Sequence, residues 1–326
     1  MSALIDVRNL STHYHLEQGL LRAVEDVTFS IREGETLGVV GESGCGKSVT
    51  ARSIMQLLPP KIGRIASGQI LFDGQDIATL DPRGAEMRGI RGGRIGMIFQ
   101  EPMTSLNPVH TIGAQIVEAI RTNSDLDKGA AWGKAVNLLD RVGINQPAER
   151  AKQYPHAFSG GMRQRAMIAM ALSCDPDLLI ADEPTTAVDV TVEAQILELI
   201  AELKAERDMS VMLITHDLNV VGEVADRVIV MYLGRVVETT TADKVFDAPA
   251  HPYTRGLLNS LPSIGRRDRL SPIEGSVPGP HERPTGCPFA PRCAQAMPKC
   301  VNLPPTFEVE DGVTAACWLY DPEAGA

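Results

Sequence analysis

The chain has 326 residues, enough for about two domains of ordinary size. Apolar residues make up 44% of it, and no apolar run approaches the roughly 18 residues of a membrane-spanning helix. The 31 basic and 41 acidic residues give a net charge of -10, the wrong sign for a protein that binds the nucleic-acid backbone. We therefore expect a globular chain with no nucleic-acid partner. Because its first ten residues lack the basic start and apolar stretch of a secretory signal, we also expect it to be cytoplasmic.

Short β-branched runs alternate with longer helical stretches, which is the pattern of an α/β domain. The predicted elements, in chain order, are strands at 27–31 and 36–40, a helix at 49–58, strands at 69–72 and 94–99, a helix at 162–173, and strands at 178–181 and 211–215. The uninterrupted apolar character of several strands indicates a sheet covered on both faces. Turn signals after the runs at 27–31 and 69–72 predict antiparallel strands near the start. The region 102–164 lacks strong strand runs and is predicted to be an inserted helical subdomain.

Proline marks a change in the organisation of the chain. Thirteen of the 22 prolines fall in the 78 residues from Pro249 onward. We therefore predict a main α/β domain over 1–248 and a differently built, proline- and cysteine-rich extension over 249–326.

The segment 41–48 carries the glycine-rich pattern G-x-x-x-x-G-K-[ST] between an apolar strand and a helical stretch, the context of a phosphate-binding loop. Its glycines let successive backbone N–H groups point at phosphate oxygens, and the following helix adds the positive end of its dipole. We expect Lys47 to reach the β- and γ-phosphates and the Ser48 hydroxyl to bind Mg²⁺. The alternative is a chance glycine turn before a helix. The predicted nucleotide contacts are Gly41, Glu42, Ser43, Gly44, Cys45, Gly46, Lys47, Ser48 and Val49.

Two carboxylates, Asp182 and Glu183, follow the apolar run at 178–181. Ligands of open α/β sheets bind at the carboxyl ends of strands, so Asp182 is predicted to hold Mg²⁺ through water and Glu183 to orient or deprotonate the attacking water. The strand at 211–215 delivers His216 to the same edge, near the expected γ-phosphate. Without the phosphate loop, a solvated helix cap and a structural histidine would explain these residues better.

A second glycine pair, Gly160 and Gly161, opens the helix predicted at 162–173, with Ser159 as its N-cap. An ordinary capped helix would show the same residues, but this helix start is also suited to an anion. One triphosphate is already held by the loop at 41–48, so the second anion site points to the nucleotide of another subunit. The sequence thus predicts a head-to-tail dimer with two nucleotides at its interface.

These motifs, in this order, resemble those of the nucleotide-binding subunits of ATP-binding cassette (ABC) transporters. Besides the phosphate loop they are Gln100, the signature at 159–164, and Asp182-Glu183 followed by His216. The resemblance implies a P-loop NTPase fold with a RecA-like core, an antiparallel β subdomain and an inserted helical subdomain. It also implies that the chain hydrolyses ATP.

The resemblance further implies roles for individual residues. Gln100 couples Mg²⁺ and the γ-phosphate to a membrane partner, Glu183 is the catalytic base and His216 is the switch residue. Tyr14 matches the aromatic residue that stacks on adenine. The residues implied to contact the nucleotide of the second subunit are Ser159, Gly160, Gly161, Gln164 and Asp189.

Four of the six cysteines, Cys287, Cys293, Cys300 and Cys317, crowd the extension with spacings C-x5-C-x6-C-x16-C. Structural zinc sites usually pair cysteines at two to four intervening residues, which this segment lacks, and a reducing compartment disfavours disulfides. An iron-sulfur cluster takes four cysteines at wider spacing. From spacing alone, a cluster, a zinc site and unliganded thiols all remain open.

The extension, the run at 100–108 and the residues at 251–254 are similar to the oligopeptide/dipeptide permease branch of ABC ATPases, whose members can carry a [4Fe-4S] cluster at such cysteines. This similarity implies a cluster with a structural role, Zn²⁺ being the alternative. It also implies two separate membrane permease subunits, a second related ATPase in a heterodimer or homodimer, and an extracytoplasmic solute-binding protein. We expect the chain at the cytoplasmic face of the inner membrane, powering import of di- and oligopeptides.

Other functions remain as alternatives. Similar subunits serve nickel, opines, glutathione and some sugars. A soluble cassette ATPase acting on nucleic acid or ribosomes is less favoured, because such proteins tend to carry two cassettes or a long coiled-coil insertion. An iron-sulfur sensor with a regulatory cassette is a third alternative.

Two cysteines stand apart from the extension. Cys45 lies inside the phosphate loop, where we expect the helix terminus and Lys47 to lower its thiol pKa and make it reactive. Cys174 is expected to be a small buried apolar residue.

Overall fold

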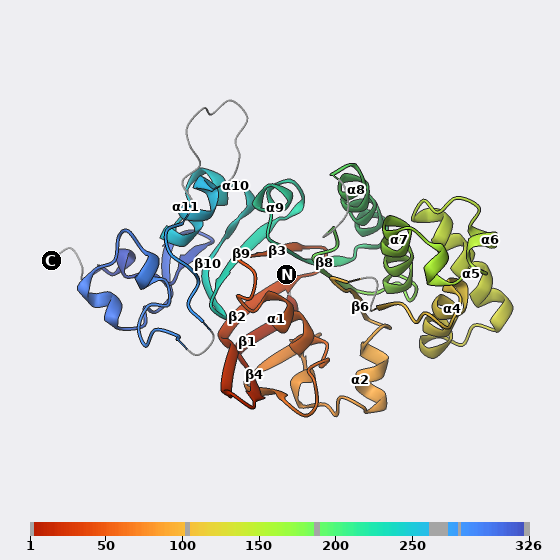
Figure 1. Ribbon diagram of the computed structural model, residues 1–326, viewed down its shortest axis with the longest axis horizontal. Helices are drawn as coiled ribbons and strands as arrows, with labels where there is room; N and C mark the ends of the chain where they lie inside the picture. The colour runs from red at the N-terminus through yellow and green to blue at the C-terminus, as the bar shows by residue number, and fades with distance from the viewer. Residues whose placement is uncertain (1–2, 102–104, 186–189, 261–272, 280–281, 323–326) are drawn as a thin grey trace. The chain divides into compact units, whose positions relative to one another are not determined.

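The computed structural model describes residues 3–101, 105–185, 190–260, 273–279 and 282–322 (Figure 1). The chain divides into two compact units. Unit one comprises Met1–Leu4, Ile31–Glu35 and Thr79–Ile214, and unit two comprises Ile5–Ser30, Thr36–Ala78 and Thr215–Ala326.

Unit one contains parallel strands in the order β8, β7, β6. They are β6 (Ile95–Ile98), β7 (Leu178–Asp182) and β8 (Ser210–Thr215). Every residue of these strands is buried, which explains why the sequence shows continuous apolar runs instead of alternation. The strands predicted at 94–99, 178–181 and 211–215 are confirmed to within one residue at each end.

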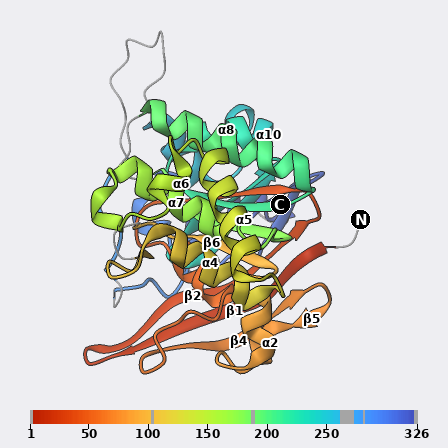
Figure 2. The same cartoon turned by 90° about the vertical axis from the view of Figure 1, so that its right-hand side faces the viewer.

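The helices of unit one occupy most of the stretch between β6 and β8. They are α2 (Ala85–Ile90), α4 (Ile112–Asn123), α5 (Lys128–Arg141), α6 (Pro147–Arg150), α7 (Gly160–Ala171) and α8 (Val190–Arg207). Figure 2 looks onto α4, α5 and α7, which pack against one another, while α7 also packs on β6. Ile112, Ile116 and Ile120 recur every fourth residue and form the buried face of α4.

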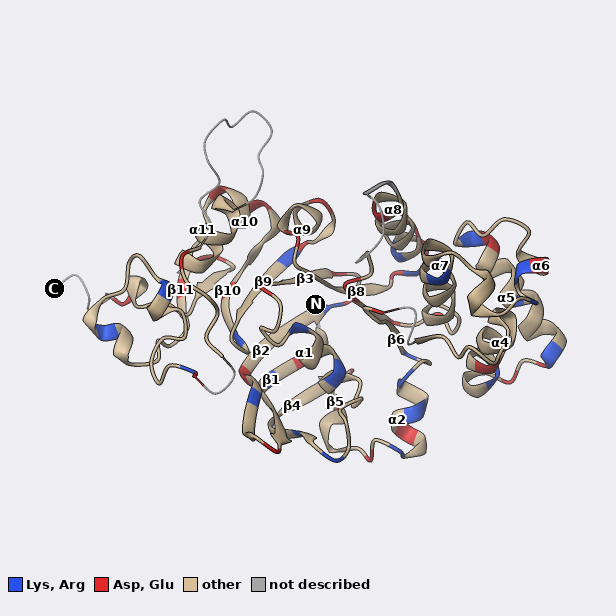
Figure 3. Ribbon diagram, viewed as in Figure 1, with Lys and Arg blue, Asp and Glu red and all other residues tan. Residues whose placement is uncertain are grey.

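Residues of both charge signs occur along the helices of unit one (Figure 3). Lys134 of α5 pairs with Asp175 at 2.7 Å, and Arg141 of the same helix pairs with Glu206. Exposed pairs of this kind contribute about 0–1 kcal/mol each. These two pairs therefore add little to the stability of the unit.

Unit two contains an antiparallel sheet in the order β2, β1, β4, β5. Its strands are β1 (Ala3–Leu16), β2 (Gly19–Arg32), β4 (Gly63–Phe72) and β5 (Gln75–Asp76). The predicted antiparallel character is confirmed by the pairing of β1 with β4, which sets Ile5 opposite Phe72. The predicted strands at 27–31 and 69–72 are only the buried ends of β2 and β4, because the rest of both strands is largely exposed and shows no apolar pattern.

A second set of strands in unit two has the order β11, β12, β10, β9, β3. These are β3 (Thr36–Val40), β9 (Arg227–Tyr232), β10 (Arg235–Thr241), β11 (Phe307–Glu310) and β12 (Val313–Ala315). Strand β3 runs parallel to β9, and the other pairs are antiparallel. Because β12 pairs with β10, the proline-rich extension contributes strands to this unit.

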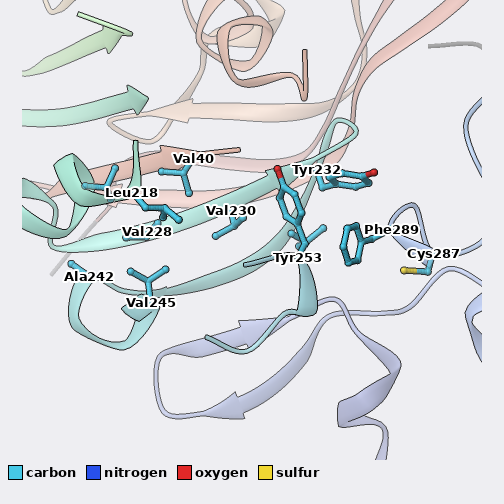
Figure 4. Packing of buried hydrophobic residues seen from close by; sticks show 12 residues of the cluster. Val40, Leu218, Val228, Val230, Tyr232, Ala242, Val245, Tyr253, Cys287 and Phe289 are labelled. Carbon is cyan, nitrogen blue, oxygen red and sulfur yellow. The ribbon is translucent and has the colours of Figure 1, made fainter. Parts of the chain in front are cut away.

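The helices of unit two are α1 (Lys47–Ile54), α9 (Leu218–Val224), α10 (Ala242–Asp247) and α11 (Pro252–Asn259). One core cluster joins strand residues such as Val228 and Val230 to Tyr253 of α11 and Phe289 of the extension (Figure 4). Within the described ranges of the whole chain, none of the helices combines the length and the apolar composition that crossing a bilayer requires.

Candidate functional site

The phosphate loop follows β3 and depends on glycines whose backbone few other residues adopt. Gly41 has φ 152° and Gly46 has φ 104°. A Cβ at Gly41 would lie 2.3 Å from the Met231 carbonyl oxygen, and one at Gly46 would lie 2.7 Å from that of Ala23. Both contacts are with backbone, which has no room to move aside. The loop is therefore restricted to glycine at these positions for reasons of geometry.

Lys47 holds the loop closed from inside. Its Nζ donates to the carbonyl oxygens of Gly41, at 2.7 Å, and Glu42, at 3.3 Å, and the residue is only 4% exposed. Helix α1 begins at Lys47, and its N-cap is Gly46, which has no side chain to accept from the N–H groups of the first turn. Such a helix start offers backbone donors and a positive dipole end to an anion.

The other predicted loop contacts differ in their surroundings. Ser43 and Gly44 are exposed, and Ser48 and Val49 are half-buried. The backbone N–H of Glu42 donates to the Tyr253 hydroxyl at 2.9 Å. Glu42 is thus engaged by the extension, and its N–H is not among the donors that face into the loop.

The expected lowering of the Cys45 thiol pKa is wrong. Its side chain is packed inside the loop and only 2% exposed, and a Cβ at Gly41 would lie 2.7 Å from its Sγ. Burial raises the pKa of the Cys45 thiol, and this desolvation outweighs the nearby Lys47 charge, which lowers the pKa. The lysine charge and the helix terminus can be read from the sequence, whereas the burial of the thiol cannot.

We expect Cys45 to resist alkylation at neutral pH, because both thiolate formation and access are suppressed. In the native protein at pH 7, iodoacetamide should label it at least tenfold more slowly than a thiol in the same protein after denaturation, measured by mass spectrometry of the peptide that contains it. Its labelling should accelerate as the pH rises toward the raised pKa. Rapid labelling of the native protein at pH 7 would contradict this assignment.

The predicted catalytic residues of unit one come together at the end of β7. Asp182 is the last residue of β7 and is 1% exposed, and Glu183 follows it with φ 48°, a left-handed backbone unusual for a residue with a side chain. The Glu183 N–H donates to the Ile214 carbonyl oxygen at 2.9 Å, which ties the residue to β8. Gln100 Nε2 donates to Glu183 Oε2 at 2.8 Å. The structure thus places Gln100 beside Glu183.

The signature residues are split between the surface and the interior. Ser159 caps α7 by accepting from the Met162 N–H at 3.3 Å, as predicted, and both Ser159 and Gly160 are exposed. Gly161 is half-buried. Gln164 is 1% exposed and donates from Nε2 to the Pro184 carbonyl oxygen, next to Glu183. Gln164 therefore connects the signature helix to the segment that follows the catalytic strand.

The remaining predicted nucleotide contacts are dispersed over the chain. Tyr14 lies half-buried on β1 opposite Gly63, where a Cβ would lie 2.8 Å from the tyrosine ring. His216 is exposed and directly follows β8, in unit two. Asp189, in the predicted crossing loop, lies outside the described residues. Lys47 and Glu183 belong to different units.

All four cysteines of the extension line one cavity. Cys287, Cys293, Cys300 and Cys317 are free thiols around a space of about 10 Å³, about what the centre of one water molecule requires. Burial raises the pKa of Cys287 to about 11 and also raises the pKa values of Cys293 and Cys317. Among the described residues, no group of three or more His, Cys, Asp and Glu side chains is arranged to hold a metal ion. The convergence of the thiols agrees with a shared role, and the cluster itself stays a prediction.

Two residues beside the phosphate loop were missed by sequence reasoning. Arg292 makes a bidentate ion pair with Glu42, and Tyr253 accepts the Glu42 N–H. Arg292 is part of the segment that joins Cys287 to Cys293, and Tyr253 is part of the run at 251–254. Neither local sequence pattern indicates a contact with a residue so distant in the sequence.

Comparison with known proteins identifies the family. The sequence profile of the ABC transporter family matches residues 24–186, and that of the oligopeptide/dipeptide transporter C-terminal region matches residues 237–300. A probable peptide ABC transporter ATP-binding protein of Sinorhizobium fredii is 52% identical over 318 residues, which cover 97% of this chain and 94% of the relative. The chain belongs to the ABC transporter family.

Other ABC proteins agree with this membership. The dipeptide transport ATP-binding protein DppD of Bacillus subtilis is 51% identical, with 99% of this chain and 97% of the relative covered. Among solved structures, the dimeric ATP-binding cassette MJ0796 bound to ADP and Pi matches with a TM-score of 0.66 at 27% identity, covering 73% of this chain and 98% of that one. The resemblance, the P-loop NTPase fold class and the ABC-type ATPase class predicted from the motifs are confirmed.

Proposed function

We propose that this ABC ATPase powers the import of di- and oligopeptides through separate membrane permease subunits, from the cytoplasmic face of the inner membrane. One observation carries the proposal. The match to peptide-transport ATP-binding proteins extends over nearly the whole chain and includes the oligopeptide/dipeptide C-terminal region at 237–300. That region lies outside the phosphate loop and the signature, so general ABC chemistry does not account for the similarity there. Nickel, opine, glutathione and sugar import are the alternative cargoes.

In this proposal, residues of the phosphate loop bind the nucleotide phosphates, and residues at or just after the ends of the buried strands help to hold Mg²⁺. The first-turn N–H groups of α1 and the Lys47 ammonium bind the phosphates, and Tyr14 stacks on adenine. Ser48, Asp182 and Gln100 supply the oxygen ligands that Mg²⁺ prefers, and the bound ion would neutralise charge on the β- and γ-phosphates.

Glu183 takes the proton of the attacking water in this proposal. Its carboxylate is held by the Gln100 amide at 2.8 Å, and its left-handed backbone is fixed by the bond to Ile214. A base that is already oriented loses little entropy when the reaction occurs. His216 contacts the γ-phosphate in this proposal, and this contact is broken when the γ-phosphate leaves.

A second ATPase subunit completes each site in this proposal, as a heterodimer or a homodimer. Ser159 and Gly160 are exposed at the start of α7, where backbone N–H groups are available to a nucleotide held by a companion subunit. Dilution of the purified ATPase should therefore lower its specific activity as dimers dissociate. A specific activity independent of concentration, in a preparation shown to be monomeric, would contradict the shared site.

The cargo is tested by reconstitution. Proteoliposomes are prepared with the ATPase, its partner ATPase, the two permeases and the solute-binding protein. ATP is supplied on the side of the membrane that carries the ATPases, and uptake of radiolabelled di- to pentapeptides is measured. The expected result is peptide uptake that requires ATP and is lost with an inactive ATPase. Uptake of nickel or a sugar without peptide uptake would replace peptide import by an alternative cargo.

We also propose that the four thiols of the extension hold a [4Fe-4S] cluster with a structural role, with Zn²⁺ as the alternative. The support is that four cysteines from 287 to 317 line one cavity, although their side chains are not arranged to hold a metal ion in its absence. Bound metal would favour the thiolate forms, which burial now disfavours at Cys287, Cys293 and Cys317. Anaerobically purified protein should contain about four iron and four sulfide per chain. Stoichiometric zinc without iron would support the alternative, and absence of both metals would leave the thiols unliganded.

A further inference from the structure

Glu42 of the phosphate loop is clamped by the extension. Arg292 Nη1 donates to Glu42 Oε2 at 2.7 Å, and Arg292 Nη2 donates to Oε1 at 3.2 Å. These two residues lie 250 positions apart in the sequence. The Arg292 side chain is only 5% exposed and that of Glu42 is 29% exposed. A bidentate, partly desolvated pair of this kind fixes both position and orientation of the carboxylate.

The extension holds the backbone of the same loop residue through Tyr253. The Tyr253 hydroxyl accepts from the Glu42 N–H at 2.9 Å, and the side chain is fully buried. Its ring packs against Tyr232 and Phe289 at centroid distances of 4.7 and 5.4 Å (Figure 4). The Arg292 guanidinium lies 5.8 Å from the centroid of the Tyr232 ring. The clamp is therefore packed against the aromatic residues of a buried core.

The same segment connects the clamp to the cysteine cavity. Arg292 directly precedes Cys293, and its backbone N–H donates to the Phe289 carbonyl oxygen at 2.9 Å. Cys287 begins the turn, and its carbonyl oxygen accepts from the Ala290 N–H at 3.1 Å. Cys287 and Phe289 belong to the buried cluster that contains Tyr253 (Figure 4). Any change at the thiols that shifts this short turn also shifts Arg292.

We infer that Arg292 and Tyr253 are positioning residues for the phosphate loop and that Arg292 transmits the state of the four-cysteine cavity to the nucleotide site. Arg292 neutralises a carboxylate that would otherwise stand, unpaired, beside a loop built to bind a highly negative triphosphate. Tyr253 accepts a hydrogen bond from the Glu42 N–H and so fixes the backbone at the start of the loop. The inference rests on the proposed use of this loop for ATP, but it does not depend on the cargo.

The first test is a double-mutant cycle on ATP affinity in the full-length chain, measured by equilibrium binding. Arg292→Gln should weaken ATP binding about tenfold or more, because it leaves the Glu42 charge unpaired. Glu42→Gln combined with Arg292→Gln should restore most of the affinity, since the repulsive charge is then gone. Arg292→Lys should lie between the wild type and Arg292→Gln, because it keeps the charge and loses the bidentate geometry.

Salt and a matched control separate this electrostatic role from a merely structural one. The defect of Arg292→Gln should shrink as ionic strength rises, because salt screens the unpaired charge. Lys244→Gln removes another ion pair, at 3.1 Å to Glu310, and should leave ATP affinity unchanged. Wild-type affinity in Arg292→Gln, or a defect that Glu42→Gln does not relieve, would overturn the positioning role.

The second test addresses transmission from the cavity. Cys293→Ser should alter ATP affinity several-fold in the wild-type background and have no further effect in the Arg292→Gln, Glu42→Gln double variant. Cys174→Ser, a half-buried cysteine of unit one outside the cavity, is the matched control and should have no effect in either background. An equal effect of Cys293→Ser in both backgrounds would show that the cavity does not act through Arg292. Both tests measure nucleotide binding. A result that excludes peptide transport would therefore not change how either test is interpreted.

Discussion

Replacement of Glu183 by glutamine should lower the rate of ATP hydrolysis about 10²- to 10⁴-fold while leaving ATP affinity within a few-fold of the parent value. Glutamine keeps the shape of the side chain and an oxygen to accept from Gln100, but it has no carboxylate to take a proton from water. The left-handed backbone at this position costs the same for both residues. Single-turnover hydrolysis and equilibrium ATP binding, measured on the same preparation, separate the two effects.

A matched variant distinguishes loss of the base from loss of a surface charge. Glu198 is an exposed carboxylate on α8 of the same unit, and Glu198→Gln should hydrolyse ATP at the parent rate. The Glu183→Gln protein should also accumulate as an ATP-dependent dimer, because the closed state no longer proceeds to products. Hydrolysis by Glu183→Gln at the parent rate would mean that another group is the base.

The strands that carry the candidate residues of unit one were predictable because they are fully buried. A parallel strand covered on both faces has no alternation, so its apolar run has sharp ends, and Asp182 and Glu183 stand out directly after one. Gln100 also follows a buried strand, β6, but only the resemblance to the family's motifs singled it out. What the pattern does not contain is the left-handed backbone of Glu183, whose N–H donates to Ile214 of a neighbouring strand.

Unit two was less predictable, because its strands mix exposed and buried residues. Only the buried ends of β2 and β4 show an apolar pattern, and the short strands β11 and β12 lie in a proline-rich stretch with little strand signal. They are strands because β10 offers an edge for pairing, which is a tertiary cause. The same holds for Arg292 and Glu42, whose pairing depends on how the extension returns to the phosphate loop.

Cys45 shows how a correct local argument fails for a tertiary reason. Its neighbours in the sequence include the lysine and helix start that normally lower a thiol pKa. The sharp turn at Gly41 packs the thiol inside the loop, and desolvation then dominates. Burial is set by the surrounding backbone, and the sequence motif contains no measure of it.

Lys47→Ala should weaken ATP binding by about 10- to 100-fold, corresponding to the loss of charged hydrogen bonds worth roughly 1.5–3 kcal/mol. Two effects combine in this variant. The ammonium that contacts the phosphates is lost, and the carbonyl oxygens of Gly41 and Glu42, which Lys47 now bridges, lose a buried donor. Equilibrium titration with ATP measures the affinity, and circular dichroism establishes that the variant is folded.

The control for Lys47→Ala removes an equal charge from the same unit. Lys61 is exposed in the loop before β4, so Lys61→Ala should bind ATP like the parent protein. Lys47→Arg keeps the charge, but its larger planar head does not fit the tight turn between the Gly41 and Glu42 carbonyl groups, so we expect most of the affinity to be lost there too. If Lys47→Ala bound ATP as tightly as Lys61→Ala, the loop at 41–48 would not be the phosphate site. The roles inferred for Glu42 and for the residues that clamp it would then be wrong as well.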